Sequence, residues 1–278
     1  MHQKKALLSW LLIAAAWPAQ GSPAAPPWPF SATIAKKLQQ RAAVDAHTPV
    51  TRTIALGKGE RIVFKLIPPG RFVIGSPPDE SGHEPDEEQR WAEVADPYYV
   101  ATTVLTKGQW EAAAGAVSDE YAALHSEQPM PFRFDDVSSR VLPALQAFAP
   151  VGWRFVLMGD EPFEFATRAG AATIYPTGTN LKDFERMAWC KGNSGGRVHE
   201  VAQLQPNAFG LYDMLGNMWQ WVDAEFVRDK TAHIVRGGSF DVPAKKNGCR
   251  SANRMISRVP VAYRPALVRV KAPSAKVD

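Results

Sequence analysis

Two cysteines are the residues of this chain best suited to chemistry, because a thiolate is both a nucleophile and a ligand for soft metals. Cys190 and Cys249 lie far apart in the sequence, and their spacing matches no zinc motif. In an oxidising compartment they could form a disulfide, or they could remain two separate buried thiols. The sequence fixes no distance between them, so both alternatives stay open.

The other residues that commonly perform catalysis form no motif. There is no HExxH, HxH or GxSxG pattern, and "RGGSF" at 236–240 lacks the lysine and the spacing of a phosphate loop. Isolated histidines are more often surface or packing residues than catalysts, and here they stand at positions 2, 47, 83, 125, 199 and 233. These residues therefore predict no mechanism.

The stretch "FGLYDMLGNMWQWV" at 209–222 is the most unusual segment. It is rich in aromatic residues but is interrupted by Gly210, Gly216 and Asn217, which favours an irregular turn with exposed carbonyl groups. The Asn217 amide could bridge such a turn, or a hard cation could collect the carbonyls together with a carboxylate such as Asp213. A structural turn without metal is the third interpretation.

The N-terminus has the pattern of a secretory signal peptide over residues 1–21. A basic start, "MHQKK", precedes the apolar run "ALLSWLLIAAAW" and small residues that predict cleavage near Gly21. The alternative is an uncleaved anchor, although the run is short for a membrane span. We therefore expect a periplasmic or secreted protein with no transmembrane segment in the mature chain.

Net charge excludes one class of partner. The formal charge of +4 would fall by two once Lys4 and Lys5 are removed with the signal peptide. No block of Lys or Arg remains, so the sequence favours no nucleic-acid partner. The acidic run at 79–88 is interpreted as a solvated loop, because it lacks the regular ligand spacing and the glycine turn of a calcium loop.

Helical segments are expected mainly in the first half of the chain. Residues 32–43 have helical spacing, with Ser31 as N-cap, and Thr106 is expected to cap a short helix that Gly115 ends. Further helices are predicted over two segments, one at 134–150 entered through Asp135 or Asp136, and one at 158–170 with Asp160 as N-cap and Gly170 at its end.

Strands and turns fill most of the remainder. Residues 54–76 predict two or three strands, and the rest after Gly170 reads as turns and short strands. Strand and helix do not alternate as a parallel sheet requires. We therefore expect a proline-rich leader with a short helix at 22–47, one compact α+β domain at 48–272 with much irregular structure, and a tail at 273–278.

Several segments, in order, resemble the formylglycine-generating enzyme (sulfatase-modifying factor) family. "PNAFGLYDMLGNMWQWV" resembles the family signature "PNxFGLYDMxGNVWEWV". Other matching segments are "IPPGRFVIGSPPDESG", "EPFEFATRAGAATIYPTG", "VRGGSF", "CRSANR" and "AYRPALV". The resemblance covers roughly residues 60–270 and implies a single α+β domain related to C-type-lectin-like folds.

The resemblance also implies a calcium site in the aromatic turn. Its ligands would be the side chains of Asp213 and Gln220 and the backbone carbonyls of Gly216 and Met218. The family has a Glu where this chain has Gln220, and calcium affinity follows ligand charge. We therefore expect weakened calcium binding, or a turn bridged by hydrogen bonds alone.

The family's oxidases hold Cu(I) between two thiolates five residues apart. Cys249 stands at the second of these positions and is the candidate catalytic residue, but Ala244 stands at the first. Copper is therefore not expected unless the fold brings Cys190 to Cys249.

Two hypotheses about function follow from this substitution. The first is an exported, non-copper domain that binds a protein, peptide or glycan partner as an accessory module. The second is an oxidase that converts a Cys of an exported sulfatase-like substrate to formylglycine. An oxidoreductase acting on a small molecule is a weaker third interpretation, and whether the protein is an enzyme stays open.

Overall fold

One antiparallel sheet carries strands from both ends of the domain. The computed structural model describes residues 28–115, 117–226, 229–245 and 248–270, so the predicted signal peptide and the 273–278 tail lie outside the described residues. The sheet has the order β1-β2-β5-β12-β7. Its strands are β1 (Thr51–Gly57), β2 (Glu60–Ile67), β5 (Tyr98–Ala101), β7 (Trp153–Val156) and β12 (Ala266–Arg269). Strand β12 pairs with both β5 and β7, so it is an interior strand that joins β7 to the rest of this sheet.

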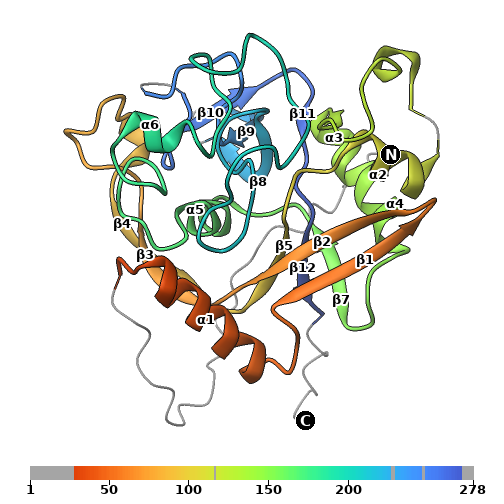
Figure 1. Ribbon diagram of the computed structural model, residues 1–278, viewed down its shortest axis with the longest axis horizontal. Helices are drawn as coiled ribbons and strands as arrows, with labels where there is room; N and C mark the ends of the chain where they lie inside the picture. The colour runs from red at the N-terminus through yellow and green to blue at the C-terminus, as the bar shows by residue number, and fades with distance from the viewer. Residues whose placement is uncertain (1–27, 116, 227–228, 246–247, 271–278) are drawn as a thin grey trace, which may run out of the picture.

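A second sheet, of order β10-β9-β8-β11-β6, lies on the other side of the molecule (Figure 1). Its strands are β6 (Pro131–Phe132), β8 (Gln220–Phe226), β9 (Asp229–Arg236), β10 (Arg254–Ser257) and β11 (Val261–Ala262). A separate hairpin joins β3 (Gly70–Ile74) to β4 (Arg90–Val94). The aromatic turn leads directly into β8, so the second sheet fixes one end of that turn.

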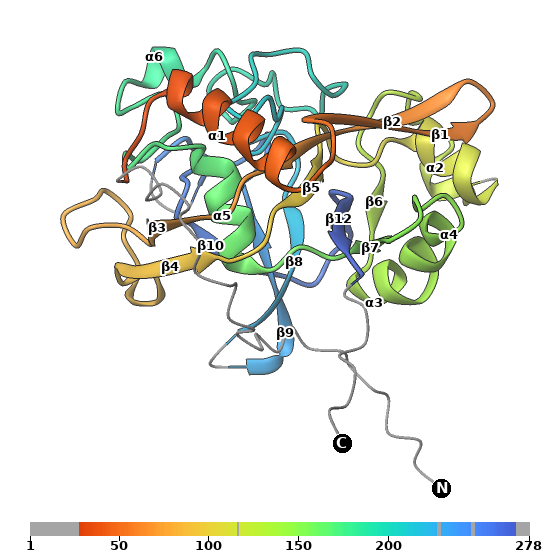
Figure 2. The same ribbon diagram turned by 90° about the horizontal axis from the view of Figure 1, so that it is seen from below.

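Helices cover the sheets rather than alternate with strands. Helix α1 (Ala32–Asp45) packs against β2 of the first sheet, and α5 (Asp160–Arg168) lies beside the β3–β4 hairpin and contacts β8 of the second sheet (Figure 2). The shorter helical segments are α2 (Lys107–Ala114), α3 (Phe134–Asp136), α4 (Leu142–Gln146), α6 (Leu181–Phe184), the 3-10 turns Pro85–Glu87 and Asp119–Tyr121, and a π-helical turn at Val137–Val141. This mixed architecture confirms the expected α+β class.

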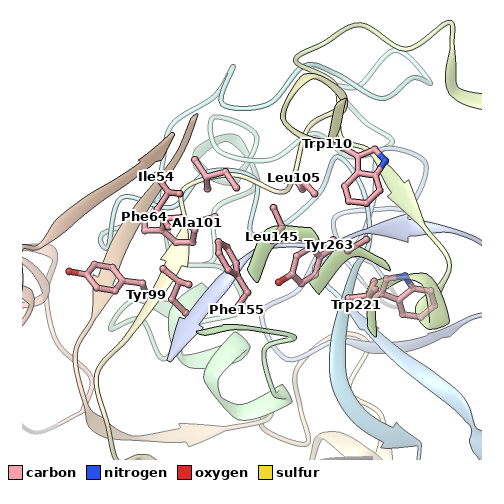
Figure 3. Close-up of a cluster of buried hydrophobic side chains, with 14 of the residues drawn as sticks. Ile54, Phe64, Tyr99, Ala101, Leu105, Trp110, Leu145, Phe155, Trp221 and Tyr263 are labelled. Atoms are coloured by element: carbon pink, nitrogen blue, oxygen red, sulfur yellow. The ribbon is translucent and has the colours of Figure 1, made fainter. Parts of the chain in front are cut away.

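Large aromatic side chains fill the core between the first sheet and the helices α2 and α4 (Figure 3). Phe64, Tyr99 and Phe155 come from β2, β5 and β7 of the first sheet. Tyr263 and Trp221 extend the cluster toward the second sheet. The Trp221 indole donates to the Phe132 carbonyl at 2.8 Å, which satisfies its only polar group. The core is therefore continuous between the two sheets.

The predicted helix starts are partly right. The Ser31 side chain accepts from the Ile34 amide, and Thr106 forms a capping box with Gln109, as the sequence indicated. Asp160, however, is the first residue of α5, and Gly159 is its N-cap. The helical segment predicted at 134–150 begins at Phe134 after Arg133, not at Asp135 or Asp136, and has no side-chain cap.

The described residues contain no helix that combines the length and the apolar character of a membrane span.

Candidate functional site

The backbone of the aromatic turn lies in direct contact with two other segments, at Trp189 and at Gly237. The Gly216 amide donates to the Gly237 carbonyl at 2.8 Å, and the Asn217 amide donates to the Trp189 carbonyl at 2.7 Å. Gly216 has a φ of +77°, and a Cβ there would lie 2.3 Å from the Trp189 oxygen. Only glycine fits this position, because both the backbone conformation and the space exclude a side chain.

The Asn217 side chain does not bridge the turn's own carbonyl groups, as one sequence interpretation had it, but joins the turn to the loop at His199. Its side-chain oxygen accepts from the His199 amide at 2.9 Å, and its side-chain nitrogen donates to the His199 carbonyl at 3.1 Å. The residue is buried and adopts a φ of +60°, which asparagine tolerates better than most residues. Asn217 therefore fixes both the backbone and the neighbouring loop.

We expect Asn217→Ala to lower the free energy of unfolding by about 3 kcal/mol, since it removes both bonds and places alanine at positive φ. Thermal or urea unfolding measures the loss. Asn217→Gly is the matched variant, because it removes the same bonds but relieves the backbone, so it should cost less. A melting temperature within a degree of the parent for Asn217→Ala would show that the turn is peripheral.

The predicted calcium ligands come together only in part. Asp213 is buried, and its Oδ2 accepts from the Ala202 amide at 2.8 Å. Gln220 turns its amide nitrogen toward the Asp213 and Met214 carbonyls, at 2.9 and 3.3 Å. Its oxygen accepts from Arg264 Nε at 2.7 Å. Since a cation needs oxygen atoms, Gln220 as placed offers it none.

The Arg264 guanidinium binds two of the turn's carbonyl groups and one carbonyl of β5. It is fully buried and donates to the Tyr212 carbonyl at 2.7 Å, to the Asp213 carbonyl at 3.0 Å and to the Ala101 carbonyl at 2.9 Å. Burial raises the pKa of Asp213, although the Ala202 amide and the Arg264 charge oppose this. Within the described part of the chain, no group of three or more His, Cys, Asp or Glu residues forms a metal site.

Cys190 and Cys249, separated in sequence, meet in one buried cluster. Both thiols are buried, together with Tyr175, Phe184 and Leu215. A hydrogen bond between the thiols lowers the pKa of Cys190 and, together with burial, raises the pKa of Cys249. Burial and the nearby thiol charges raise the pKa of Tyr175 to about 12. The fold therefore supplies Cys249 with a sulfur neighbour that the sequence could not predict.

Ala244, at the position of the family's other copper ligand, lies beside the same cluster. Its carbonyl accepts from the Tyr175 hydroxyl at 3.1 Å, and its side chain packs on the cluster. The Cys249 thiol itself contacts the Ser239 carbonyl at 3.6 Å. Both cysteines are at most 1% exposed, so neither sulfur is open to a substrate in this conformation.

A buried ionic network links α5 to the strands β9 and β10 of the second sheet. Glu164 accepts from Arg168 Nε at 2.9 Å, from Arg236 at 2.5 Å and from the Gly75 amide at 2.8 Å. Asp160, predicted to be an N-cap, instead pairs with Arg254 at 2.9 Å. These charges are deeply buried and mutually compensated, so they serve to hold elements together.

The acidic run at 79–88 is not simply a solvated loop, which corrects the sequence interpretation. Glu87 is buried and forms a two-pronged pair with Arg250, at 2.7 and 2.8 Å, and Glu80 reaches the same guanidinium at 2.7 Å. This pairing could not be predicted from the sequence, because Arg250 lies more than 160 residues from Glu87. The run therefore anchors the segment that carries Cys249.

Two depressions on the described surface are poor candidates for a small-molecule site. One, of about 160 Å³, has Trp110, Tyr121, Phe132, Arg133 and Arg140 among its lining residues. The other, of about 370 Å³, is lined by Lys58, Glu60, Gly108, Glu111, Ala112, Gly115 and Ser126, none of them aromatic. Pockets for small organic ligands are typically about 300–1,000 Å³ and mostly apolar, so neither depression has the expected character.

Sequence comparisons match this chain to one protein family and to one curated relative. Residues 58–262 match the family model described as the sulfatase-modifying factor enzyme 1-like domain. The "Inactive C-alpha-formylglycine-generating enzyme 2" of Bos taurus is 29% identical over 92 residues, which cover 29% of this chain and 31% of that protein. The chain thus aligns with about a third of that relative's length.

Solved structures share the fold at low sequence identity. PvdO from Pseudomonas aeruginosa has a TM-score of 0.67 and 21% identity, with 80% of this chain and 100% of that one covered. Treponema denticola variable protein 1 has a TM-score of 0.65 and 19% identity, with 79% and 99% covered. CarF has a TM-score of 0.57 and 15% identity, with 78% and 100% covered. At these identities the likeness establishes the fold alone.

Proposed function

The chain belongs to the sulfatase-modifying factor enzyme 1-like family, and we propose that it is a non-catalytic member that acts as an exported binding or accessory module. Its partner would be a protein, peptide or glycan. The observation that carries this proposal is the state of the sulfur site. Ala244 replaces one thiolate, and Cys249 is buried against Cys190 and the Ser239 carbonyl.

Burial argues against oxidase chemistry at Cys249. A substrate cysteine would have to reach a thiolate or a thiolate-bound metal, yet both sulfurs lie inside a cluster walled by Tyr175 and Phe184. The two rings stack at 4.0 Å and close the cluster on one side. The Bos taurus relative, named as inactive, supports the same interpretation.

The oxidase remains the second candidate, because one observation favours it. A linear Cu(I) site needs two soft sulfur ligands, and the fold brings Cys190 and Cys249 together. Those two residues would hold the metal, and a bound copper would supply the oxidising chemistry. Access to the site would then require local opening around Tyr175.

One experiment separates the two functions. The purified protein is loaded with Cu(I) and offered a peptide that contains Cys-x-Pro-x-Arg, and the peptide mass is followed. We expect no copper-dependent conversion of the peptide thiol to an aldehyde and no tight copper binding. Conversion that is lost in Cys249→Ala would overturn the non-catalytic proposal.

Export is part of the proposal and has its own measurement. The basic start and apolar run predict cleavage near Gly21. Intact mass and N-terminal sequencing of the protein expressed in a Gram-negative host should show the processed chain in the periplasm. Full-length protein retained in the membrane fraction would contradict this.

We also propose that the turn depends little on calcium, because Arg264 and Gln220 satisfy several of its carbonyls. The parent melting temperature should change by less than about 1 °C between millimolar calcium and a chelator. In Gln220→Glu, a carboxylate would face the Asp213 and Met214 carbonyls, so calcium should stabilise this variant by about 2 kcal/mol or more when it saturates the site.

Two controls make the calcium prediction specific. Magnesium at equal concentration should not reproduce the effect, because it tolerates irregular oxygen sites poorly. Adding Asp213→Asn to Gln220→Glu should abolish the calcium response. A parent protein that calcium stabilises as strongly as the Gln220→Glu variant would refute the proposal.

A further inference from the structure

Two chain segments that carry the cysteines are tied together by hydrogen bonds. The Lys191 amide donates to the Val242 carbonyl at 3.0 Å, and the Ser194 hydroxyl donates to the Phe240 carbonyl at 2.8 Å. The Cys249 amide donates to the Pro243 carbonyl at 3.0 Å. Residues 190–194 therefore form one local unit with residues 239–245 and 248–249, and each of the two segments presents one thiol to it.

Packing holds the two thiols toward each other. A Cβ on Gly238 would lie 2.6 Å from Cys249 Sγ, so the backbone of the "RGGSF" segment closes one side of that sulfur. Tyr175 and Phe184 belong to the same cluster, and the thiols hydrogen-bond to each other. Neither thiol contacts bulk solvent, and each has the other as its sulfur neighbour.

We propose that Cys190 and Cys249 are joined by an intramolecular disulfide when the protein folds under oxidising conditions. The cross-link would join Cys190, before the aromatic turn in sequence, to Cys249, after it. The turn would then lie within a loop that the disulfide closes. This inference goes beyond the binding function proposed above and does not depend on it.

The reaction is thiol–disulfide exchange with a disulfide oxidant, either a small molecule or a dithiol oxidoreductase. The Cys190 thiolate attacks the oxidant's disulfide, forms a mixed disulfide and releases the first thiol of the oxidant. Cys249 then loses its proton and attacks Cys190 Sγ, which releases the second thiol. Two protein thiols become one disulfide, and one disulfide becomes two thiols, so the electrons balance.

Burial sets the order of these events. The hydrogen bond from Cys249 lowers the pKa of Cys190, so Cys190 is the better attacking group only where the two segments stay close together, as in a local opening. Because the folded cluster excludes solvent, the oxidant must act before the segments close or during local opening. The native protein should then resist oxidation and reduction far more than the unfolded chain does.

The test is a count of free thiols on the full chain. One sample is refolded in a buffer rich in oxidised glutathione, and the other in a buffer rich in reduced glutathione. After denaturation with a chelator and N-ethylmaleimide, the oxidised sample should carry no label and the reduced sample two labels. Peptide mapping without reductant should recover a cross-linked peptide that contains Cys190 and Cys249. Oxidation should raise the melting temperature by about 5–10 °C, because the disulfide closes a long loop of the unfolded chain.

Single variants supply the controls. Cys190→Ala and Cys249→Ala should each show by intact mass either one labelled thiol or one glutathione adduct, with no internal cross-link, and should lack the rise in melting temperature that oxidation gives the parent. Two labelled thiols in the oxidised parent, or disulfides only between molecules, would overturn the cross-link and leave the binding function standing. Two labelled thiols in the oxidised parent, together with one metal ion per chain measured before denaturation, would show bound metal instead of a disulfide. Together with peptide oxidation, that result would overturn both proposals.

Discussion

Glu164→Gln is expected to lower the free energy of unfolding by about 3–5 kcal/mol, because it removes one partner of a buried ionic network. The carboxylate is fully buried and contacts Arg168, Arg236 and, at 3.4 Å, Arg254. Glutamine has the same shape but no charge, so it leaves buried guanidinium groups short of a counter-charge. Urea unfolding, followed by circular dichroism and fluorescence, measures the change.

Glu161→Gln is the matched control on the same helix. Glu161 pairs with Arg90 at 2.6 Å, but that arginine is 58% exposed, and exposed pairs contribute roughly 0–1 kcal/mol. The control should therefore unfold within about 1 kcal/mol of the parent. Equal effects of the two variants would show that burial of Glu164 has no energetic consequence.

The same network gives stability a defined dependence on pH. Burial would raise the pKa of Glu164, but the charges of Arg168, Arg236 and Arg254 outweigh burial and hold its pKa below the ordinary value. A carboxyl group with a lowered folded-state pKa contributes stability that is present above its unfolded pKa of about 4.3 and lost as the pH falls through the folded pKa.

The lowered pKa of Glu164 predicts how the free energy of unfolding of the parent and of Glu164→Gln should differ at each pH. Above about pH 5 the full difference between them should be present, since the unfolded carboxyl is then ionised. Below pH 4 the curves should converge, because a protonated Glu164 resembles glutamine. Asp160, whose pKa is also lowered, remains in both proteins and steepens both curves alike. A difference that grows toward acid pH would contradict this account of the network.

The fold class and the turn could be predicted because their signals are local. Gly216 and Asn217 require particular backbone conformations, and the structure gives them φ of +77° and +60°. Capping by Ser31 and by Thr106 depends on residues within three positions, and both caps are present. Local chemistry of this kind is visible without knowledge of the tertiary fold.

Contacts between distant segments could not be predicted in the same way. Glu87 looked solvated because its neighbours in sequence are acidic, but Arg250 neutralises it across the fold. Asp is a common N-cap residue, but the Asp160 carboxylate pairs with Arg236 and Arg254 instead of capping the helix. The meeting of Cys190 and Cys249 belongs to the same class, since no spacing rule relates them.

Arg264 is the residue that sequence reasoning undervalued most, and its position explains why. The sequence shows it only as the arginine of "AYRPALV", a segment matched to the family's ending. Its guanidinium reaches four acceptors on three segments, namely the carbonyls of Ala101, Tyr212 and Asp213 and the Gln220 side chain. The five donors of arginine in a planar arrangement suit such a site.

Arg264→Met should therefore lower the free energy of unfolding by about 3–5 kcal/mol, because it retains most of the buried volume but leaves several buried acceptors without a donor. Arg264→Lys should fall between parent and Met, since one ammonium restores the charge but cannot reach all four acceptors. Arg197→Met, at an exposed position, is the matched control and should be nearly neutral. If calcium restores Arg264→Met but leaves Arg264→Lys unchanged, the guanidinium stands where a cation would otherwise bind. Loss of less than about 1 kcal/mol in Arg264→Met would show that other donors hold the turn.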